Sequence, residues 1–463
     1  MRFKDLREFI SALQDRHEIK SIQGAATELE IGAVTQLAAE SARCPALLFD
    51  SIPGFRNGQR VLTNGMASKS RERLVFGLSQ DLSEKDALSA WKEKLKQYQP
   101  VAPANSAQAP VKQNMLAGGE IDLAKLPWLR WYDDDPVACQ HGTLVATKDP
   151  RTGEVGLTSQ SFAWIDRDTL ATRVAPGAID PVWQEYWASG KPCPLAISLG
   201  QDPALLAAAL GGSGLPGLAG YGLAGWFRGA AVEVTDGEFT GLPIPANAEI
   251  VLEGEVNPPG QAAGAQAQDQ TLPPTVKIHR LYFRNDPIML AGAPFLTSTH
   301  GVLASNAAAL WLDLEDRGLA GIHGVNHRPW GVTVMSIKQL DAGHVKRVTR
   351  ALMESSASRN LRYAIVVDDD IDPFNLEKVF WAIATRYEPQ VALEIVRRVG
   401  MGGDDLTGAK ENGGTANHGG AAAIIDACRP YRWIDKFPRT TDISEALMKQ
   451  TVHKWGKVLE RKA

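Results

Sequence analysis

The sequence predicts a mixed α/β fold whose middle part is built mainly of β-strands. Residues 1–113 and 306–463 alternate short apolar runs with segments of helical periodicity, which is typical of α/β layers. Residues 114–305 contain many runs of strand length that are separated by turn residues, with few helices among them. A chain of 463 residues is long enough for two to three domains. We therefore expect three domains with these bounds, the last of which ends in a C-terminal helix.

The first domain shows the order helix, strand, helix, strand, which indicates a small α/β layer. Four apolar residues repeat at helical spacing near its start: Leu6, Phe9, Ile10 and Leu13. An extended segment at 19–22, a helix from about 30 to 43 and a short buried strand at 46–49 follow. The stretch 97–113 is polar and contains Pro and Gln, so it offers few large apolar side chains to bury. We place the first domain boundary there.

The middle domain contains a predicted β-meander between Gly142 and Trp187. Its expected strands are 143–147, 155–164 and 169–174, with turns at 149–153 and 165–168. A meander gives one face to a core and leaves the other face able to line a pocket, so we expect its side chains to set the chemistry. Five later runs also have strand length: 195–199, 231–235, 250–255, 275–283 and 287–290. Together these runs predict a barrel or a sandwich.

The last domain alternates strands and helices, which predicts a doubly wound layer. The expected strands are 330–337 and 362–367, and the expected helices are 343–354 and 375–385. The acids Asp368, Asp369 and Asp370 end the second strand and could bind a divalent cation. Acids at a helix N-terminus also interact favourably with the helix dipole, and we favour this structural interpretation. The basic helix around Trp455 is expected to be a docking or dimer element.

Composition and charge exclude several classes of partner. The net charge of -4, with 44% apolar and 22% charged residues, is ordinary for a soluble globular protein. No basic stripe or polybasic run occurs, so we expect neither nucleic acid nor a membrane surface as a partner. No apolar run approaches the roughly 18 residues of a membrane span. The four cysteines lie far apart without a CxxC pair, which favours a reducing cytoplasm over a disulfide framework or a thiolate zinc site.

A set of short motifs is spread over nearly the whole chain: DLREFISALQ with EIKSI, PALLFDSIPG, KDPRTGEVGL, LGQDPALLAAAL, GWFRGAAVEV, IPANAEIVLEG, HRLYFRNDPI, VVDDDIDPFNLEKVFWAIATR and AIIDACRP. In this order the motifs resemble the UbiD family of decarboxylases. The resemblance implies an N-terminal α/β domain, a central split β-barrel like that of flavin reductases, and a C-terminal α/β domain. It also implies a carboxy-lyase, a decarboxylase or reversible carboxylase, that acts on a small aromatic or unsaturated carboxylic acid. Homodimers or dimer-built hexamers are expected for the family.

The resemblance further implies prenylated FMN with a divalent metal and potassium, but this chain departs from the family pattern. The family's metal-binding asparagine, its arginine beside the flavin, its metal-binding glutamate and its phosphate-binding lysine fall at Glu154, Ser159, Gly220 and Ala422. The expected metal-binding histidine, and the glutamate of an EGPFGE-like loop near 256–274, are also replaced. A buried flavin phosphate needs a cation to offset its charge, and one carboxylate does not make a divalent metal site. The sequence therefore predicts an atypical cofactor site, or no cofactor, and no metal site is assigned.

Four residues are candidates for acid–base work near the family's cofactor pocket: His300, Glu154, Ser159 and Tyr221. His300 lies in a THGVL stretch where the family also has a histidine, although it could equally be a hydrogen-bonded residue of the pocket wall. Two alternatives to the carboxy-lyase remain open. One is a cofactor-independent hydrolase or isomerase of a small organic acid on the same scaffold. The other is a non-catalytic subunit that supports a homologous partner chain.

Overall fold

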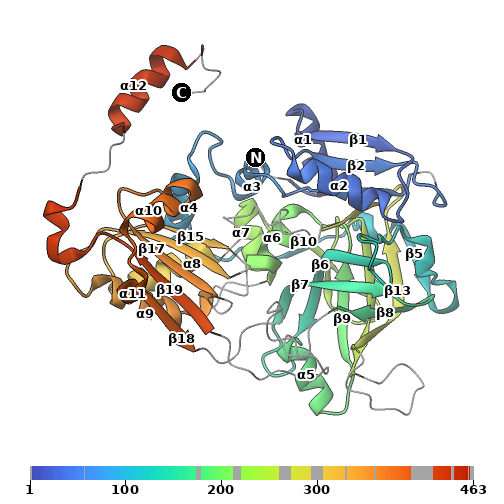
Figure 1. Ribbon diagram of the computed structural model, residues 1–463. Helices are drawn as coiled ribbons and strands as arrows, with labels where there is room; N and C mark the ends of the chain where they lie inside the picture. Colours follow the sequence, from blue (N-terminus) through green and yellow to red (C-terminus); the bar gives the residue numbers. More distant parts are fainter. Residues whose placement is uncertain are drawn as a thin grey trace.

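The structure, a computed structural model, contains four β-sheets with helices packed around them (Figure 1). It describes residues 3–56, 58–173, 179–211, 220–259, 273–292, 306–328, 331–358, 361–397, 421–438, 443–456 and 458. Among the described helices, none combines the length and the apolar character that crossing a membrane requires. The mixed α/β class predicted from the sequence is confirmed, because helices and strands alternate in both outer parts and strands dominate the middle.

The N-terminal part is an α/β layer built on a four-stranded sheet. Its elements are α1 (Leu6–Asp15), β1 (Ile19–Gln23), α2 (Glu30–Glu40), β2 (Ala46–Asp50), β3 (Arg60–Thr63), α3 (Lys69–Phe76) and α4 (Glu84–Leu95). Asp5 caps α1, since its carboxylate accepts a hydrogen bond of 2.9 Å from the Glu8 N–H. The predicted run 287–290 becomes β14 (Ile288–Leu290), which pairs with β3. That run therefore belongs to this sheet and not to the barrel that the sequence suggested for it.

The middle part contains a closed barrel of six antiparallel strands. The strands are β6 (Cys139–Lys148), β7 (Val155–Trp164), β8 (Thr169–Thr172), β9 (Cys193–Ser198), β12 (Ile250–Asn257) and β13 (Thr275–Phe283). They run in the order β12-β9-β6-β7-β8-β13, and a further pairing of β12 with β13 closes the barrel. Short elements flank it: β4 (Ala104–Asn105), β5 (Asn114–Ala117), α5 (Pro181–Ala188), β10 (Glu233–Asp236) and β11 (Pro243–Pro245). The barrel predicted for this region is thereby confirmed.

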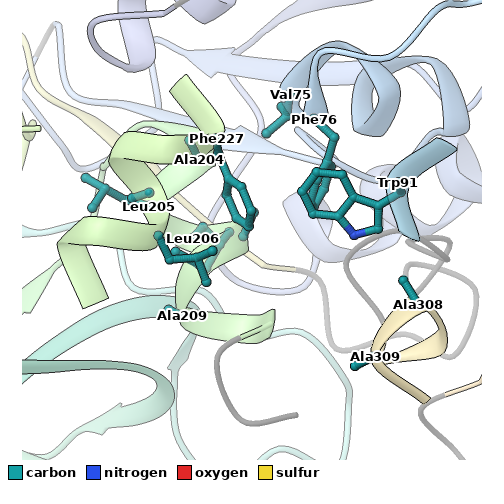
Figure 2. Close-up of a cluster of buried hydrophobic side chains, with 14 of the residues drawn as sticks. Val75, Phe76, Trp91, Ala204, Leu205, Leu206, Ala209, Phe227, Ala308 and Ala309 are labelled. Atoms are coloured by element: carbon teal, nitrogen blue, oxygen red, sulfur yellow. The ribbon is translucent and has the colours of Figure 1, made fainter. Parts of the chain in front are cut away.

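The two faces of the barrel strands differ because successive side chains point to opposite sides. Val145, Phe162 and Leu252 point inward and belong to one buried cluster. Leu144 and Leu157 point outward and join a second cluster with α6 (Pro203–Gly211) and α7 (Gly220–Arg228). Figure 2 shows how this second cluster continues to the N-terminal part, where α6 and α7 residues lie near aromatic side chains of α3 and α4. The aromatic rings involved are Phe76, Trp91 and Phe227, with Phe76 centred 4.5 Å from Trp91 and 5.1 Å from Phe227.

The C-terminal part is a five-stranded sheet with helices on both faces. Its elements are α8 (Ala307–Asp316), β15 (Ile322–Arg328), β16 (Val332–Ile337), α9 (His344–Glu354), β17 (Tyr363–Asp368), α10 (Leu376–Arg386), α11 (Pro389–Ala392), β18 (Leu393–Arg397), β19 (Ala421–Ala427) and α12 (Glu445–Trp455). The strand order is β15-β16-β17-β19-β18, with parallel pairing from β16 to β19. Residues of α8 and α9 pack on one face and residues of α10 on the other. In Figure 1, α12 projects away from the rest of the chain.

Candidate functional site

Three polar side chains from neighbouring strands lie in a line on the outer face of the barrel, and we call them the polar row: His141, Ser161 and Arg173. Ser161 shares the outward face of β7 with Leu157, because the two residues are four positions apart on one strand. Arg173 directly follows β8, and its backbone N–H donates a hydrogen bond of 2.9 Å to the Ser161 carbonyl. The pairing of β6, β7 and β8 therefore brings these side chains together.

A bulge in β6 holds His141 in this line. The pairing of β6 with β7 is interrupted between Gln140 and Thr143. Gly142 within the bulge has a φ of +71°, and a Cβ there would come within 3.1 Å of the Gly292 Cα. The Gly292 N–H donates a hydrogen bond of 2.9 Å to the His141 carbonyl. A pair of glycines thus lets two backbone segments approach closely and fixes the position of His141.

His141 is held as a neutral imidazole. Its Nδ1 lies 2.8 Å from the Ser161 Oγ, and its Nε2 makes no hydrogen bond to a described residue. Burial and, to a smaller extent, the nearby Arg173 guanidinium lower the pKa of His141 to about 4, while Asp135 acts in the opposite direction. At pH 7 the ring therefore carries one donor and one acceptor nitrogen. A neutral imidazole in this arrangement can accept a proton at Nε2 while Nδ1 stays bonded to the hydroxyl.

The guanidinium of Arg173 is available to an anion. Among the described residues its nearest carboxylate is Asp135, with 4.0 Å between Nη1 and Oδ1, and 39% of the Arg173 side chain is exposed. The side chain of Arg173 makes no hydrogen bond to a described residue. Asp135 instead accepts hydrogen bonds from the backbone N–H groups of Trp131 and Tyr132, at 3.2 and 3.1 Å. A guanidinium whose donors no described residue accepts suits a carboxylate, which it can bind in a bidentate manner.

Two of the residues predicted from the sequence, Glu154 and Ser159, lie along β7 or at its start. Glu154 is exposed in the turn that precedes β7. Ser159 is partly buried on the outward face, opposite Leu144 and two residues before Ser161. Gly220 lies beside the start of β7, since a Cβ on it would come 3.0 Å from the Val155 carbonyl oxygen. The structure therefore brings Ser159 next to the polar row, while Glu154 and Gly220 lie near the other end of the strand.

The remaining candidates are placed elsewhere. Tyr221 is buried among core side chains, and its hydroxyl donates a hydrogen bond of 2.7 Å to the Pro243 carbonyl. Burial raises the pKa of Tyr221 above its ordinary value. Ala422 is buried on β19 in the C-terminal sheet. His300 and most of the loop 256–274 lie outside the described residues. A catalytic role for any of these residues stays a prediction.

The residues at the family's metal positions do not fit a divalent cation. Glu154 is exposed, and Gly220 has no side chain to offer. No group of three His, Cys, Asp or Glu side chains within the described ranges could hold a metal ion. Divalent cations need several ligands at defined geometry, and a flavin phosphate in turn needs such a cation or another positive group to offset its charge. The metal-dependent manner of holding a flavin phosphate is therefore not supported at these two positions.

The sequence prediction missed the polar row, although part of the signal was present. A turn at 165–168 pairs the strands on either side, and this pairing places Arg173 next to Ser161. His141 could not be placed in the same way, because its orientation depends on the bulge and on Gly292 from a distant segment. Strand pairing thus creates the polar row, and no local sequence motif predicts it.

Comparison with known proteins assigns the chain to a family. Its residues 10–91, 103–295 and 304–427 match the family models of the N-terminal, Rift-related and C-terminal domains of 3-octaprenyl-4-hydroxybenzoate carboxy-lyase (UbiD). A pyrrole-2-carboxylic acid decarboxylase of Pseudomonas aeruginosa is 30% identical over 423 residues, which cover 83% of this chain and 83% of that protein.

Solved structures share the fold over the whole length. The open form of the vanillic acid decarboxylase of Sedimentibacter hydroxybenzoicus superposes with a TM-score of 0.80 at 24% identity, covering 100% of both chains. An evolved dimeric form of the UbiD-class enzyme HmfF of Pelotomaculum thermopropionicum, in complex with prFMN, has a TM-score of 0.75 at 22% identity and covers 96% of this chain and 99% of its own. Since the models of all three domains match in order along its length, the chain belongs to the UbiD family of carboxy-lyases.

Proposed function

We propose that this chain is a carboxy-lyase that removes the carboxylate of a small aromatic acid or adds it in the reverse direction. Family membership supports the reaction class, and relatives are named as decarboxylases of pyrrole-2-carboxylic and phenolic acids. The observation that carries the proposal is the guanidinium of Arg173, which makes no hydrogen bond to a described residue and lies on the outer face of the barrel. An aromatic acid brings a carboxylate that such a group binds.

The surroundings of Arg173 suit an aromatic carboxylate. Without a ligand His141 is neutral, so Arg173 is the one cation of the polar row before a carboxylate binds. The Trp131 ring lies edge-on to His141 with 6.2 Å between ring centroids, and as a buried side chain it packs against the imidazole. Ser159 and Ser161 supply hydroxyl groups on the same strand face. The site thus combines one cation with neutral hydrogen-bonding groups.

The proposal is built on the chain's own side chains. HmfF is described with prFMN, and prenylated FMN is the cofactor that the family implies. Glu154 would add negative charge where the family places a metal-bound phosphate, and Gly220 cannot supply a ligand. We therefore propose that any flavin would be held differently from the family pattern, and we derive no step through it. Absorbance spectra of protein produced with and without the flavin-prenylating enzyme test this point.

We also propose that the chain forms a homodimer through its C-terminal sheet. Tyr363, Ala423 and Ile395 lie side by side on β17, β19 and β18, on the face that α10 covers only in part. Tyr363 is 46% and Ile395 60% exposed, and Phe380 on α10 is 62% exposed. Such a continuous apolar patch at the sheet edge suits a second copy of the chain.

The isolated position of α12 supports the same proposal. This helix of 11 residues exposes Leu447, Met448 and Trp455, and it projects from the body in Figure 1. A helix this short is marginal in water without a packing partner. Light scattering should give the dimer mass for the wild type and a lower mass for Ile395→Glu, while Leu37→Glu, at a 70% exposed position on α2, should leave the mass unchanged. A monomeric wild type, or a second homologous chain that copurifies, would contradict the homodimer, and the latter favours the non-catalytic subunit.

Carbon dioxide release tests the proposed reaction. Wild-type protein, produced with and without the flavin-prenylating enzyme, is incubated with pyrrole-2-carboxylate, vanillate and 3,4-dihydroxybenzoate. We expect release from at least one acid, and a KM raised about tenfold or more in Arg173→Gln, because a charged hydrogen bond contributes roughly 1.5–3 kcal/mol. Arg350→Gln serves as a matched control, since Arg350 is 83% exposed and pairs with Glu354. The absence of both carbon dioxide release and binding of every acid would overturn the proposal.

A further inference from the structure

We propose that His141 is the proton-transfer residue of this site and that Ser161 is its positioning residue. The inference rests on the proposed carboxy-lyase function and deepens it. Loss of carbon dioxide from an aromatic acid requires a proton to replace the carboxylate on the ring carbon. The segment 256–274, where the resemblance implies a glutamate that handles this proton, contains no glutamate and a single acid, Asp269, so a group elsewhere in the site is a candidate for the proton transfer.

Placement separates His141 from the other titratable groups. Glu154 precedes β7 and lies seven residues before Ser161, which corresponds to roughly 23 Å along an extended strand. The Tyr221 hydroxyl is already bonded to the Pro243 carbonyl. Asp135 accepts two backbone N–H groups and faces Arg173. Among the described residues next to Arg173, His141 therefore has the ring nitrogen that remains uncommitted.

Cys139 is a further titratable group near His141 on β6, but its thiol is unsuited to proton transfer. Its side chain is 1% exposed, and burial raises the pKa of the thiol to about 12. A thiol that is neither accessible nor ionised at neutral pH cannot pass protons to a ligand. Among the described residues, the charged groups that shift the pKa of His141 are Arg173 and Asp135.

The hydroxyl of Ser161 suits a histidine that changes protonation state. A hydroxyl can donate and accept, so it can stay bonded to Nδ1 whether that nitrogen carries a proton or not. In the neutral ring we assign the proton to Nδ1, which donates to the Ser161 Oγ across 2.8 Å and leaves the lone pair on Nε2. Protonation at Nε2 then requires no movement of the ring.

The substrate carboxylate binds beside Arg173, and its negative charge favours the imidazolium form of His141, whose Nε2 takes a proton from hydronium in the solvent and leaves water. The Nε2 proton moves to the ring carbon that bears the carboxylate, and the π electrons of the ring form the new C–H bond. The bond between that carbon and the carboxylate breaks, its electron pair returns to the ring, carbon dioxide leaves, and His141 is neutral again.

Exchange of the product's ring hydrogen in D₂O isolates this proton transfer from carbon dioxide release. NMR of the product from whichever acid the wild type decarboxylates measures the rate at which deuterium enters the former carboxylate position. We expect His141→Gln to lower that rate and kcat by 100-fold or more, the range of general acid–base catalysis, with KM changed less than threefold. Ser161→Ala should lower kcat about tenfold and shift the pH profile, and Ser161→Thr should restore both. Ser21→Ala, at an exposed position on β1 of the N-terminal sheet, is the control, expected to change neither.

Binding without turnover gives a second readout. The NMR signal of the His141 imidazole is identified by its absence from the His141→Gln spectrum. Benzoate added to the full-length protein should raise the pKa of this imidazole by about 1. If folded His141→Gln, checked by thermal unfolding, incorporates deuterium at the wild-type rate, the proton-transfer role is overturned and the proposed carboxy-lyase function still stands. A wild type that neither releases carbon dioxide nor exchanges deuterium overturns both. If His141→Gln does not fold, unchanged kcat and pH profile in Ser161→Ala overturn the proposal.

Discussion

The guanidinium of Arg386 makes two hydrogen bonds to Asp370, of 2.8 and 2.7 Å. The same guanidinium donates to Asp368 across 3.0 Å, and Asp368 also accepts from the Arg429 N–H at 2.7 Å and the Gln339 amide at 2.8 Å. The acids that end β17 are therefore held by cations from α10 and from the segment after β19. The acidic run thus has a structural role through ion pairs, whereas the sequence predicted one through a helix dipole, and these carboxylates lack the open ligand set that a metal requires.

Replacing Arg386 should strongly destabilise the C-terminal part. Asp368 is 1% exposed, and removing one partner of a buried ion pair typically costs about 3–5 kcal/mol because a buried charge loses its compensation. We expect Arg386→Met to lower the free energy of unfolding, measured with urea, by that amount. Arg350→Met, which removes an exposed pair with Glu354, should cost less than about 0.5 kcal/mol. Equal losses in the two variants would contradict the importance of burial.

Asp202 should make stability fall as pH rises. It caps α6 through a 2.7 Å hydrogen bond from the Ala204 N–H, and burial raises its pKa to about 6 although Arg228 acts in the opposite direction. The folded pKa lies above the unfolded one of about 3.9, so the stabilisation is present below pH 3.9 and is lost as pH rises through 6. The wild type should lose roughly 2 kcal/mol more than Asp202→Asn between pH 4 and pH 7.

Comparison with the variant is needed because histidines act in the opposite direction. Burial lowers the pKa of His327 to about 4, so its contribution is lost as pH falls from the unfolded value of about 6.5. This loss occurs equally in wild type and Asp202→Asn and cancels in their difference. Urea unfolding at several pH values gives that difference directly. Parallel profiles for the two proteins would show that Asp202 keeps an ordinary pKa.

Local patterns were sufficient to predict the class of fold but not the closure of the barrel. The helix Leu6–Asp15 follows from apolar spacing and the Asp5 cap, and the β7–β8 hairpin follows from its turn residues. The pairing of β12 with both β9 and β13 joins distant segments, so it depends on which strands can bury each other's faces. Similarly, the apolar run of β14 predicts a strand but not its partner, which could be a barrel strand or β3.

The candidate site shows the same division. Ser159 could be found from the motif and lies on the face of β7 that also carries Ser161. His141 could not, because its orientation depends on the bulge at Gly142 and the approach of Gly292, neither of which has a local signature. The sequence also made Tyr221 a candidate. It could not show that the Tyr221 hydroxyl is bonded to the Pro243 carbonyl, because that hydrogen bond exists only in the folded chain.

Tyr221→Phe separates a catalytic hydroxyl from a packing one. The variant leaves the Pro243 carbonyl without its donor, so we expect the free energy of unfolding to fall by about 1–2 kcal/mol and carbon dioxide release to change less than twofold. Tyr98→Phe is the control, because the Tyr98 hydroxyl makes no hydrogen bond to a described residue and its loss should change neither quantity. A 100-fold loss of carbon dioxide release with unchanged stability would instead support Tyr221 as an acid or base.

Gly220 should resist restoration of the family's metal-binding glutamate. Its φ is +72°, which side-chain-bearing residues adopt at a cost of roughly 1–2 kcal/mol, and a Cβ would lie 3.0 Å from the Val155 carbonyl oxygen. The glycine is thus tied to how α7 begins beside β7. We expect Gly220→Ala and Gly220→Glu to lower the free energy of unfolding by similar amounts, because the Cβ is the common cause.

The double variant Glu154→Asn with Gly220→Glu recreates two of the family's metal ligands and tests whether backbone geometry is the obstacle. We expect calorimetric titration with Mn²⁺ to show no tighter binding than in Glu154→Asn with Gly220→Ala, because the strained backbone would have to shift before the new carboxylate could reach a cation shared with residue 154. Glu154→Asn alone should keep wild-type stability, since Glu154 is exposed. Micromolar Mn²⁺ binding by the double variant, at undiminished stability, would show that only the side chains had been exchanged and that the chain retains the family's metal geometry.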